Sequence, residues 1–307
     1  MIFNLSKYKS YFQNKLNKIG RLPLPGDNSV TLGDTVAFMW TALQSSEFSV
    51  RAGAMAFNFF FALFPGLIFL ITLVPLMPID NLQREVLLFM RQYLPDEGFQ
   101  LVYDTLTITM EENRSSLLSI SFFLVAFSAT RGILVMMYTF DRNEAGFTRR
   151  NVVRARLLAM GMVWLLTIFF LMALSVVITA EVWMGYLNLE NTPLPHIGAA
   201  AIRIADTFMT FGVLWVAFAI IYHFIPSREK RWKFFSPGAL LGSFLALIAT
   251  IAFGLFMANF GNYNKIYGTL SAVMVLMVWM FWISNVILIG FEFNVAIEKA
   301  KLSSIKD

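Results

Sequence analysis

The sequence contains no cysteine, only two histidines (His196 and His223) and few charged residues. The absence of cysteine excludes a disulfide framework, a thiolate metal site and a cysteine nucleophile. Two histidines leave little for metal chemistry, so we expect neither a metal site nor a cofactor. Charged residues make up 14% of the 307 residues, against about 25% in soluble domains. This is too little polar surface to coat a water-soluble globule of that size.

Apolar residues are abundant instead, at 58% of the chain. They form six continuous runs that each reach the roughly 20 residues needed to cross a bilayer as a helix. The runs lie at about 52–77, 116–140, 157–186, 201–225, 236–260 and 269–296. They are continuous rather than alternating, which disfavours a β-barrel, and backbone groups in lipid must bond within their own segment. The sequence therefore predicts an all-α, polytopic membrane bundle of about six transmembrane helices.

The positions of lysine and arginine predict how this bundle is oriented. Eighteen of the 24 basic residues lie in residues 1–51, between the second and third runs, between the fourth and fifth, or after residue 298. Only four lie in the opposite connections. Cytoplasmic loops carry the excess of lysine and arginine, so both termini are predicted to be cytoplasmic. The net charge of +5 then reflects topology, and we expect no nucleic acid as a partner.

The charge pattern divides the chain into three parts. Residues 1–51 are predicted to be a cytoplasmic basic segment. Within it, residues 5–19 have the spacing of an amphipathic helix that would lie on an anionic leaflet. The alternative for these residues is a solvated arm. Residues 52–298 would form the bundle, and residues 299–307 a cytoplasmic tail. The acidic connection at 78–115 predicts an outer helical hairpin that acts as a cap or as a lid.

Ionisable residues inside the predicted spans are costly and mark functional candidates, among which Arg131 and Glu292 lie toward the cytoplasmic side. Arg131 is 9 residues from the cytoplasmic end of its run, about 13 Å along a helix. Glu292 in the last run lies at a similar depth, which suggests an ion pair between the two. Alternatively Glu292 reaches the interface, and Arg131, beside Ser128, binds an anionic headgroup through two parallel hydrogen bonds.

Further candidates come from basic, polar and helix-breaking residues. Anionic lipid gathers at the cytoplasmic face, where the candidate contacts are Arg149, Arg150, Arg154 and Arg156. Pro65, in the middle of the first run, predicts a kink or a helix break, with Asn58 as a polar group lining the bend. Gly238 and Gly242 predict a close helix contact. An outer polar vestibule, or simply a satisfied hairpin, is indicated by Asn259, Asn262, Asn264 and Tyr267.

Five blocks of the sequence carry a resemblance. They read RAGAMAFNFFFALFPGL (51–67), FSATRGI (127–133), FIPSREKRWKFFSPGAL (224–240), NFGNYNKIYGTLSAV (259–273) and GFEFN (290–294). In order and spacing they resemble the bacterial YihY/BrkB family of inner-membrane proteins, over about residues 30 to 298. Phe57 and Asn58 depart from the tyrosines common there. The resemblance implies a multi-pass protein of the bacterial inner (plasma) membrane with about six helices. Members of the family have been associated with serum resistance and, as a proposal, with transport of envelope lipid or lipopolysaccharide. Some members also carried a ribonuclease label.

The residues allow these functions to be weighed. Metal-dependent RNA hydrolysis needs clustered His, Asp or Glu, which the predicted cytoplasmic face lacks, so we expect no ribonuclease and no enzyme. The favoured hypothesis is a transporter or flippase that moves or delivers an anionic lipid or lipid-like envelope precursor. No Walker A motif is present, so energy would come from elsewhere. The alternative is a non-catalytic membrane scaffold for envelope assembly, with envelope-assembly proteins or a second copy of the chain as partners.

Overall fold

The computed structural model describes residues 23–24, 27–73, 87, 103, 115–141, 150–186, 195–228, 231–258 and 270–304. Within these ranges the chain forms seven helices and one two-stranded ribbon. The helices are α2 (Leu32–Leu43), α3 (Ser46–Leu73), α6 (Ser115–Phe140), α7 (Val152–Tyr186), α8 (Pro195–Phe224), α9 (Pro237–Ala258) and α11 (Leu270–Ser304). The ribbon pairs β1 (Pro23–Leu24) with β2 (Asp27–Thr31) in antiparallel fashion.

The predicted helical membrane architecture is confirmed in outline. Among the described residues, five helices contain stretches long and apolar enough to cross a bilayer, namely Phe123–Phe140, Val152–Ala173, Thr207–Phe224, Pro237–Met257 and Val273–Ser303. They correspond to the second to sixth predicted runs. The first run falls on α3, whose 28 residues span about 42 Å. The short ribbon is the one departure from a wholly helical chain within the described ranges, and it packs against α11.

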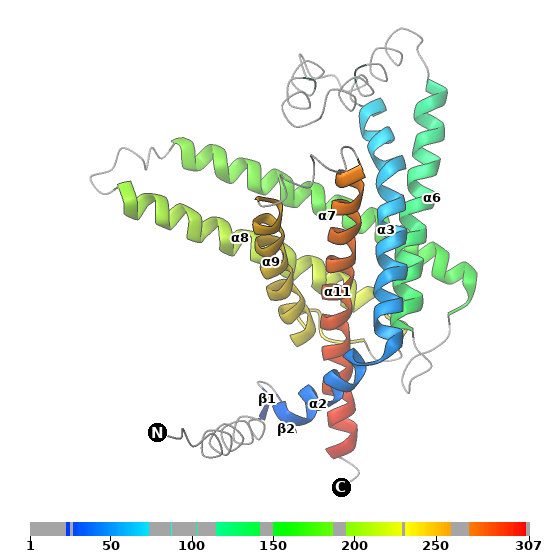
Figure 1. Ribbon diagram of the computed structural model, residues 1–307, viewed down its shortest axis with the longest axis vertical. Coiled ribbons are helices and arrows are strands. Elements are labelled where there is room, and N and C mark those ends of the chain that lie inside the picture. The colour runs from blue at the N-terminus through cyan, green and yellow to red at the C-terminus, as the bar shows by residue number, and fades with distance from the viewer. Residues whose placement is uncertain are drawn as a thin grey trace, which may run out of the picture.

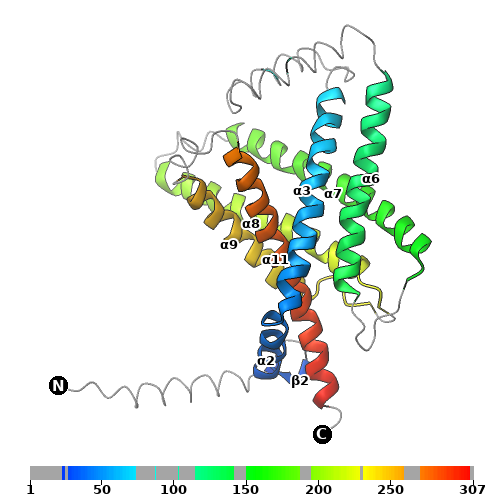
Figure 2. The same cartoon turned by 45° about the vertical axis from the view of Figure 1, so that its right-hand side comes forward.

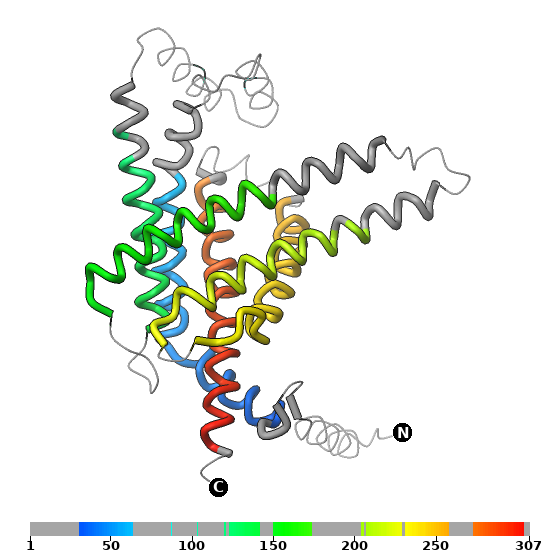
Figure 3. The backbone as a smooth tube through the Cα atoms, turned by 180° about the vertical axis from the view of Figure 1, so that it is seen from behind, coloured from blue at the N-terminus to red at the C-terminus, as the bar shows by residue number. Residues whose placement is uncertain are grey.

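The helices divide into an upright group and an inclined group. In Figure 1, α3, α6 and α11 run side by side along the long axis of the molecule. Helix α9 packs against both α11 and α8. Helix α7 crosses α6 obliquely in all three views, and α8 is inclined to the upright group as well (Figures 2 and 3). The contact between α6 and α7 is therefore a crossing rather than a parallel seam.

The main core lies where the upright helices meet the end of α8. Its centre includes the fully buried side chains of Met55, Phe140, Tyr222 and Phe291. The rings of Phe140 and Phe291 stack in parallel, with centroids 4.1 Å apart and planes 2° apart. The hydroxyl of Tyr222 donates to the backbone oxygen of Ile287 at 2.8 Å, which satisfies the polar tip of a buried ring.

Glycines allow α9 to approach its neighbours closely. A Cβ atom on Gly238 would collide with the carbonyl oxygen of Gly290, and a Cβ on Gly290 would collide with the hydroxyl of Tyr222. One turn along α9, a Cβ on Gly242 would lie 2.8 Å from Phe218 Cδ1 of α8. The predicted close contact at the Gly238 and Gly242 pair is thus confirmed: Gly238 faces α11 and Gly242 faces α8.

Of the two alternatives predicted at Pro65, a kink or a helix break, the break is wrong. Helix α3 continues without interruption from Ser46 to Leu73. A proline removes one backbone donor, so the turns on either side keep their own hydrogen bonds. Transmembrane helices tolerate this loss when neighbouring groups compensate for it. Asn58, expected to line the bend, instead donates from Nδ2 to the Ala54 oxygen of its own helix at 2.8 Å.

The N-terminal region begins with a capped helix. Thr31 Oγ1 accepts the backbone N–H of Asp34 at 3.2 Å, which fixes the start of α2. Val36 and Trp40, one turn apart on α2, are exposed. The amphipathic helix expected at 5–19 and the outer hairpin expected at 78–115 lie outside the described residues, apart from isolated positions in the second. At the other end, α11 passes residue 298 and continues to Ser304.

Candidate functional site

The structure pairs Glu292 with Arg51 rather than with Arg131. Arg51 Nη1 lies 2.7 Å from Glu292 Oε1, and the side chains are 11% and 2% exposed. Arg51 Nη2 donates to the backbone oxygen of Thr139 at 2.6 Å. The sequence placed Arg51 just outside the first span, but α3 begins at Ser46, so Arg51 lies on the helix and faces α11. This ion pair ties together α3, α6 and α11.

Arg131 is exposed on α6, and an arginine of α7 approaches the same part of that helix. The guanidinium carbon of Arg156, from α7, lies 5.7 Å from the centroid of the Phe127 ring. Phe127 is one turn before Arg131 on α6, so Arg156 reaches the part of α6 that carries Arg131. Arg154 and Arg156 are exposed like Arg131. We call Arg131, Arg154 and Arg156 the α6–α7 arginine group.

No member of the α6–α7 arginine group forms an ion pair with any residue in the described part of the chain. All three lie within the membrane-length stretches of α6 and α7. Arginine in such a stretch is stabilised by pairing, by water or by reaching the interface. The group thus presents positive charge for which the described protein supplies no counter-ion.

A narrow cavity of about 160 Å³ opens beside this group. It lies between α6 and α7 and is lined by Val125, Ala126, Thr130, Met160, Val163, Trp164 and Thr167. Thr130 precedes Arg131, and its hydroxyl is already bonded to the Ala126 oxygen at 2.5 Å. Met160 lies one turn after Arg156. The crossing therefore combines cations with an adjoining apolar crevice, the two features of a site for an anionic amphiphile.

Arg150, predicted to contact lipid, bonds the protein itself. Its Nη1 donates to the Ile225 oxygen at 2.7 Å, and its Nη2 donates to the Pro226 oxygen at 2.9 Å. Burial lowers the pKa of the Arg150 guanidinium, and Asp141 opposes this shift. Arg150 bonds the protein because the connection 225–228 folds back beside the start of α7, which the sequence spacing did not indicate.

Asp141 ties the end of α6 to the same connection. Its Oδ1 accepts the backbone N–H of Ser227 at 2.8 Å. Burial raises the pKa of the Asp141 carboxyl above its ordinary value of 3.8, although the Ser227 hydrogen bonds and the charge of Arg150 oppose the shift. Asp141 and Arg150 thus join the α6–α7 connection to the one between α8 and α9.

The connection before α9 is also fixed to α11. Arg228 forms an ion pair with Glu298, and the Trp232 indole donates to Glu298 Oε2 at 3.1 Å. Asn294 Oδ1 accepts the Gly238 N–H at 2.8 Å. His223 Nδ1 lies 2.9 Å from the Trp232 oxygen, a structural role. Sequence reasoning missed Asn294 and Arg51, although both stand in the blocks that carry the family resemblance.

The remaining predicted site residues fall into two classes. Ser128 is half-buried on α6, three residues before Arg131. Arg149 and the predicted vestibule residues Asn259, Asn262, Asn264 and Tyr267 lie outside the described residues. Within the described ranges, no group of three or more His, Asp or Glu side chains could hold a metal ion. The described residues therefore offer no ligand set for metal-dependent hydrolysis.

Comparison with known proteins identifies the family. The family model described as Virulence factor BrkB matches residues 39–307. A ribonuclease-like protein, YfkH of Bacillus subtilis, is 23% identical over 82% of this chain and 90% of its own length. A UPF0761 membrane protein of Tolumonas auensis is 23% identical over 87% of this chain and 86% of its own length. One from Xanthomonas campestris is 24% identical over 80% of this chain but only 57% of its own length.

No solved structure matches the chain. The family model, by contrast, covers the described helices from α3 to α11 and begins within α2. The helices that could cross a membrane agree with the membrane-protein names of the UPF0761 relatives. The chain is a multi-pass membrane protein that belongs to the BrkB family.

Proposed function

We propose that this protein resides in the bacterial inner membrane and binds an anionic lipid or lipid-like envelope precursor. It would move that lipid across the membrane or deliver it from the cytoplasmic leaflet. The observation that carries the proposal is the α6–α7 arginine group. It places three exposed guanidinium groups on two apolar, membrane-length helices, where no described acidic residue neutralises them.

A lipid phosphate fits this arrangement for two reasons. Guanidinium groups bind phosphate with two parallel hydrogen bonds and are more weakly hydrated than ammonium groups. The apolar crevice beside Thr130 and Met160 can take part of an acyl chain while the phosphate stays with Arg131 and Arg156. An inorganic anion would use the charges but would leave the crevice unfilled.

Two other functions, ribonuclease and membrane scaffold, are less well supported by the described residues. YfkH is named ribonuclease-like, but the described part of this chain holds no clustered acids or histidines for metal-assisted RNA cleavage. The scaffold hypothesis depends on the hairpin expected at 78–115, of which only isolated positions are described. Lipid binding is therefore the function that the observed geometry supports best.

Reconstituted protein tests the proposal. The full chain is inserted into liposomes of phosphatidylglycerol and phosphatidylethanolamine that carry a trace of fluorescent phosphatidylglycerol. Quenching of the outer leaflet then reports how fast the labelled lipid changes sides. We expect faster exchange than in empty vesicles, and a loss of about tenfold in Arg131→Gln, because a charge-assisted bidentate contact worth about 1.4 kcal/mol or more would be removed.

Two further variants sharpen this test. Arg131→Lys keeps the charge but not the planar fork, so an intermediate rate is expected. Lys301→Gln removes one positive charge from an exposed position near the end of α11 and should leave the rate unchanged. Exchange no faster than in empty vesicles would refute movement of this lipid. Equal rates for the wild type and Arg131→Gln would refute the role of the α6–α7 arginine group.

A further inference from the structure

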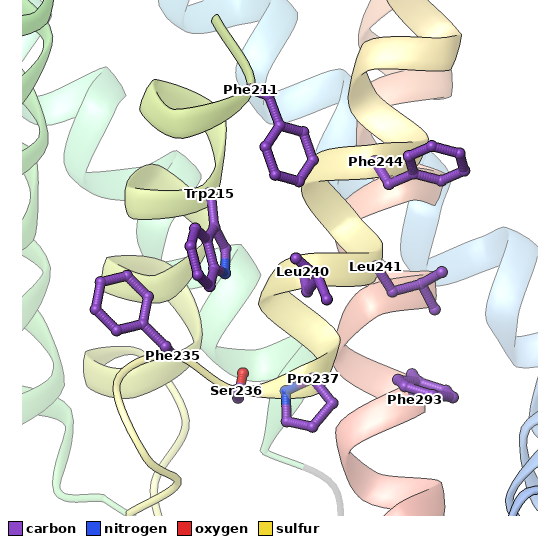
Figure 4. A pocket seen from close by; sticks show the side chains of 9 residues that line it. All are labelled: Phe211, Trp215, Phe235, Ser236, Pro237, Leu240, Leu241, Phe244 and Phe293. Atoms are coloured by element: carbon purple, nitrogen blue, oxygen red, sulfur yellow. The ribbon is translucent and has the colours of Figure 1, made fainter. Parts of the chain in front are cut away.

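A second and larger cavity lies between α8, α9 and α11. Its volume is about 610 Å³, within the range of about 300–1,000 Å³ that ligand pockets occupy. It is lined by Phe211, Trp215, Phe235, Ser236, Pro237, Leu240, Leu241, Phe244 and Phe293. Figure 4 shows these side chains gathered around the space between α8 and the first turns of α9. We call this cavity the α8–α9 pocket.

The wall of the α8–α9 pocket selects an apolar ligand. Seven of its nine residues are aromatic or leucine. The single hydroxyl in the wall, on Ser236, already accepts hydrogen bonds from Asn294 Nδ2 at 3.0 Å and from the Ala239 N–H at 3.3 Å. A polar ligand would therefore find few partners there, whereas a hydrocarbon chain loses nothing by entering.

One polar group of the wall lacks a partner among the described residues. Trp215 Nε1 is buried and donates no hydrogen bond. Figure 4 shows its nitrogen edge turned toward Leu240 on α9. Leu240 is 48% exposed, so its side chain can rotate outward at little cost. A ligand that carries a hydrogen-bond acceptor next to its apolar part would then satisfy the indole N–H.

The order of residues along the pocket fixes the direction of such a ligand. Trp215 lies next to Phe235, with ring centroids 4.6 Å apart, at the end where α9 begins. Phe211 and Phe244 lie one to two helical turns further in. The segment just before Phe235 carries two exposed cations, Arg231 and Lys233. Charge, acceptor site and apolar wall thus follow one another from the predicted cytoplasmic side inward.

We infer that the α8–α9 pocket binds one acyl chain of an anionic glycerophospholipid from the cytoplasmic leaflet. The phosphate would lie beside Arg231 and Lys233, the ester carbonyl beside Trp215, and the chain between Phe211 and Phe244. Basic pockets between helices on the cytoplasmic side recruit anionic headgroups in this way. This site shares no residue with the α6–α7 arginine group, and the inference stands without the proposed movement of lipid.

Photolabelling tests the inference directly. The full chain is reconstituted into vesicles that contain phosphatidylglycerol with a diazirine near the end of one acyl chain. After illumination, labelled peptides are identified by mass spectrometry. We expect labels to concentrate on the segments around Phe211 and Phe244. Leu240→Trp should fill the pocket and reduce those labels about tenfold, because the indole would occupy the space that the acyl chain needs.

A matched variant separates the pocket from the general lipid surface. Ile248, two turns further along α9, is 45% exposed and does not line the pocket. Ile248→Trp therefore introduces the same bulk at a similar exposure and should leave the labels unchanged. Undiminished labelling in Leu240→Trp would overturn the inference. An equal loss in both variants would also overturn it, since the labels would then report the lipid-facing side of α9 in general.

A separate comparison of two lipids tests the assignment of the headgroup. Phosphatidylcholine with the same diazirine chain should label the pocket several times less than phosphatidylglycerol. Arg231→Gln with Lys233→Gln should bring the two lipids to equal labelling. Equal labelling in the wild type would overturn the anionic preference. Arg131→Gln should leave the pocket labels intact, so failure of this site and failure of the α6–α7 site are distinguishable.

Discussion

Arg51 and Glu292, separated by 241 residues in the sequence, form an ion pair with 2.7 Å between Nη1 and Oε1. The pair lies beside the stacked rings of Phe140 and Phe291. Glu292 follows Phe291 in the sequence, and Arg51 also bonds the backbone oxygen of Thr139, the residue before Phe140. The upright helices are thus joined by polar contacts embedded in an apolar core. Such contacts set the relative register of helices, because any shift would bury unpaired charge.

Removal of one partner from this pair should destabilise the protein strongly. Glu292→Gln removes the carboxylate with which Arg51 pairs in the described structure, and loss of one partner from a buried ion pair costs about 3–5 kcal/mol of the free energy of unfolding. Thermal unfolding of the detergent-purified protein measures the loss. Arg131→Gln, at an exposed position, should change stability by no more than about 0.5 kcal/mol. Equal effects of the two substitutions would contradict the pairing.

The glycine crossing makes a second prediction. Gly290→Ala would drive a methyl group into the Tyr222 hydroxyl and the Gly238 oxygen, so α9 and α11 must separate. Overpacking of this kind costs about 1–3 kcal/mol. Gly254→Ala in the same bundle meets no atom within 4 Å and should be neutral or stabilising by up to about 1 kcal/mol. The unfolding temperature should therefore fall in Gly290→Ala and stay the same or rise in Gly254→Ala, and an equal fall in both variants would argue against the crossing.

Asp141 makes the stability depend on pH in a defined direction. Burial raises its pKa above 3.8 in the folded protein, so the folded state holds this proton more tightly than the unfolded state. The resulting stabilisation is complete below the unfolded pKa and is lost as pH rises through the folded pKa. Asp141→Asn does not titrate and keeps an acceptor for the Ser227 N–H.

The unfolding temperature of Asp141→Asn, relative to that of the wild type, should therefore increase between acid and neutral pH. Scanning calorimetry or intrinsic fluorescence at several pH values from acid to neutral measures this difference, which cancels titrations common to both proteins. A difference that stays constant with pH, or that falls as pH rises, would show that burial does not control this carboxyl.

Arg150 provides a test between a lipid contact and a structural one. Arg150→Lys retains the charge but cannot reach both the Ile225 and Pro226 oxygens. The loss of a charged hydrogen bond should lower stability by about 1.5–3 kcal/mol, with little effect on phosphatidylglycerol binding. A stable variant with weakened lipid binding would restore the original prediction that Arg150 contacts lipid.

The sequence predicted the helices well because their signal is long and continuous. Runs of apolar residues near 116–140 and 236–260 coincide within a few residues with α6 and α9. The helix break considered at Pro65 does not occur, since a proline perturbs one hydrogen bond while the flanking turns persist. The close packing at Gly238 was predictable because only small residues permit it.

The partners of charged residues were much harder to predict. The similar depths of Arg131 and Glu292 along their helices suggested that the two residues form an ion pair. Depth does not say which side of each helix faces its neighbour. Arg51 faces α11, whereas Arg131 faces outward from the described chain. The α8–α9 pocket has no signal in the sequence at all, because phenylalanine and leucine line cavities and fill cores alike.

The hydrogen bond from Tyr222 to the Ile287 oxygen has a mechanical consequence. It fixes α8 to α11 close to the point where α9 is locked against α11 by Gly238 and Gly290. Trp215 lies seven residues, or about two turns, before Tyr222 on α8. A change in the tilt of α8 about this anchor would widen or narrow the space beside Trp215 while leaving the joint at Tyr222 intact.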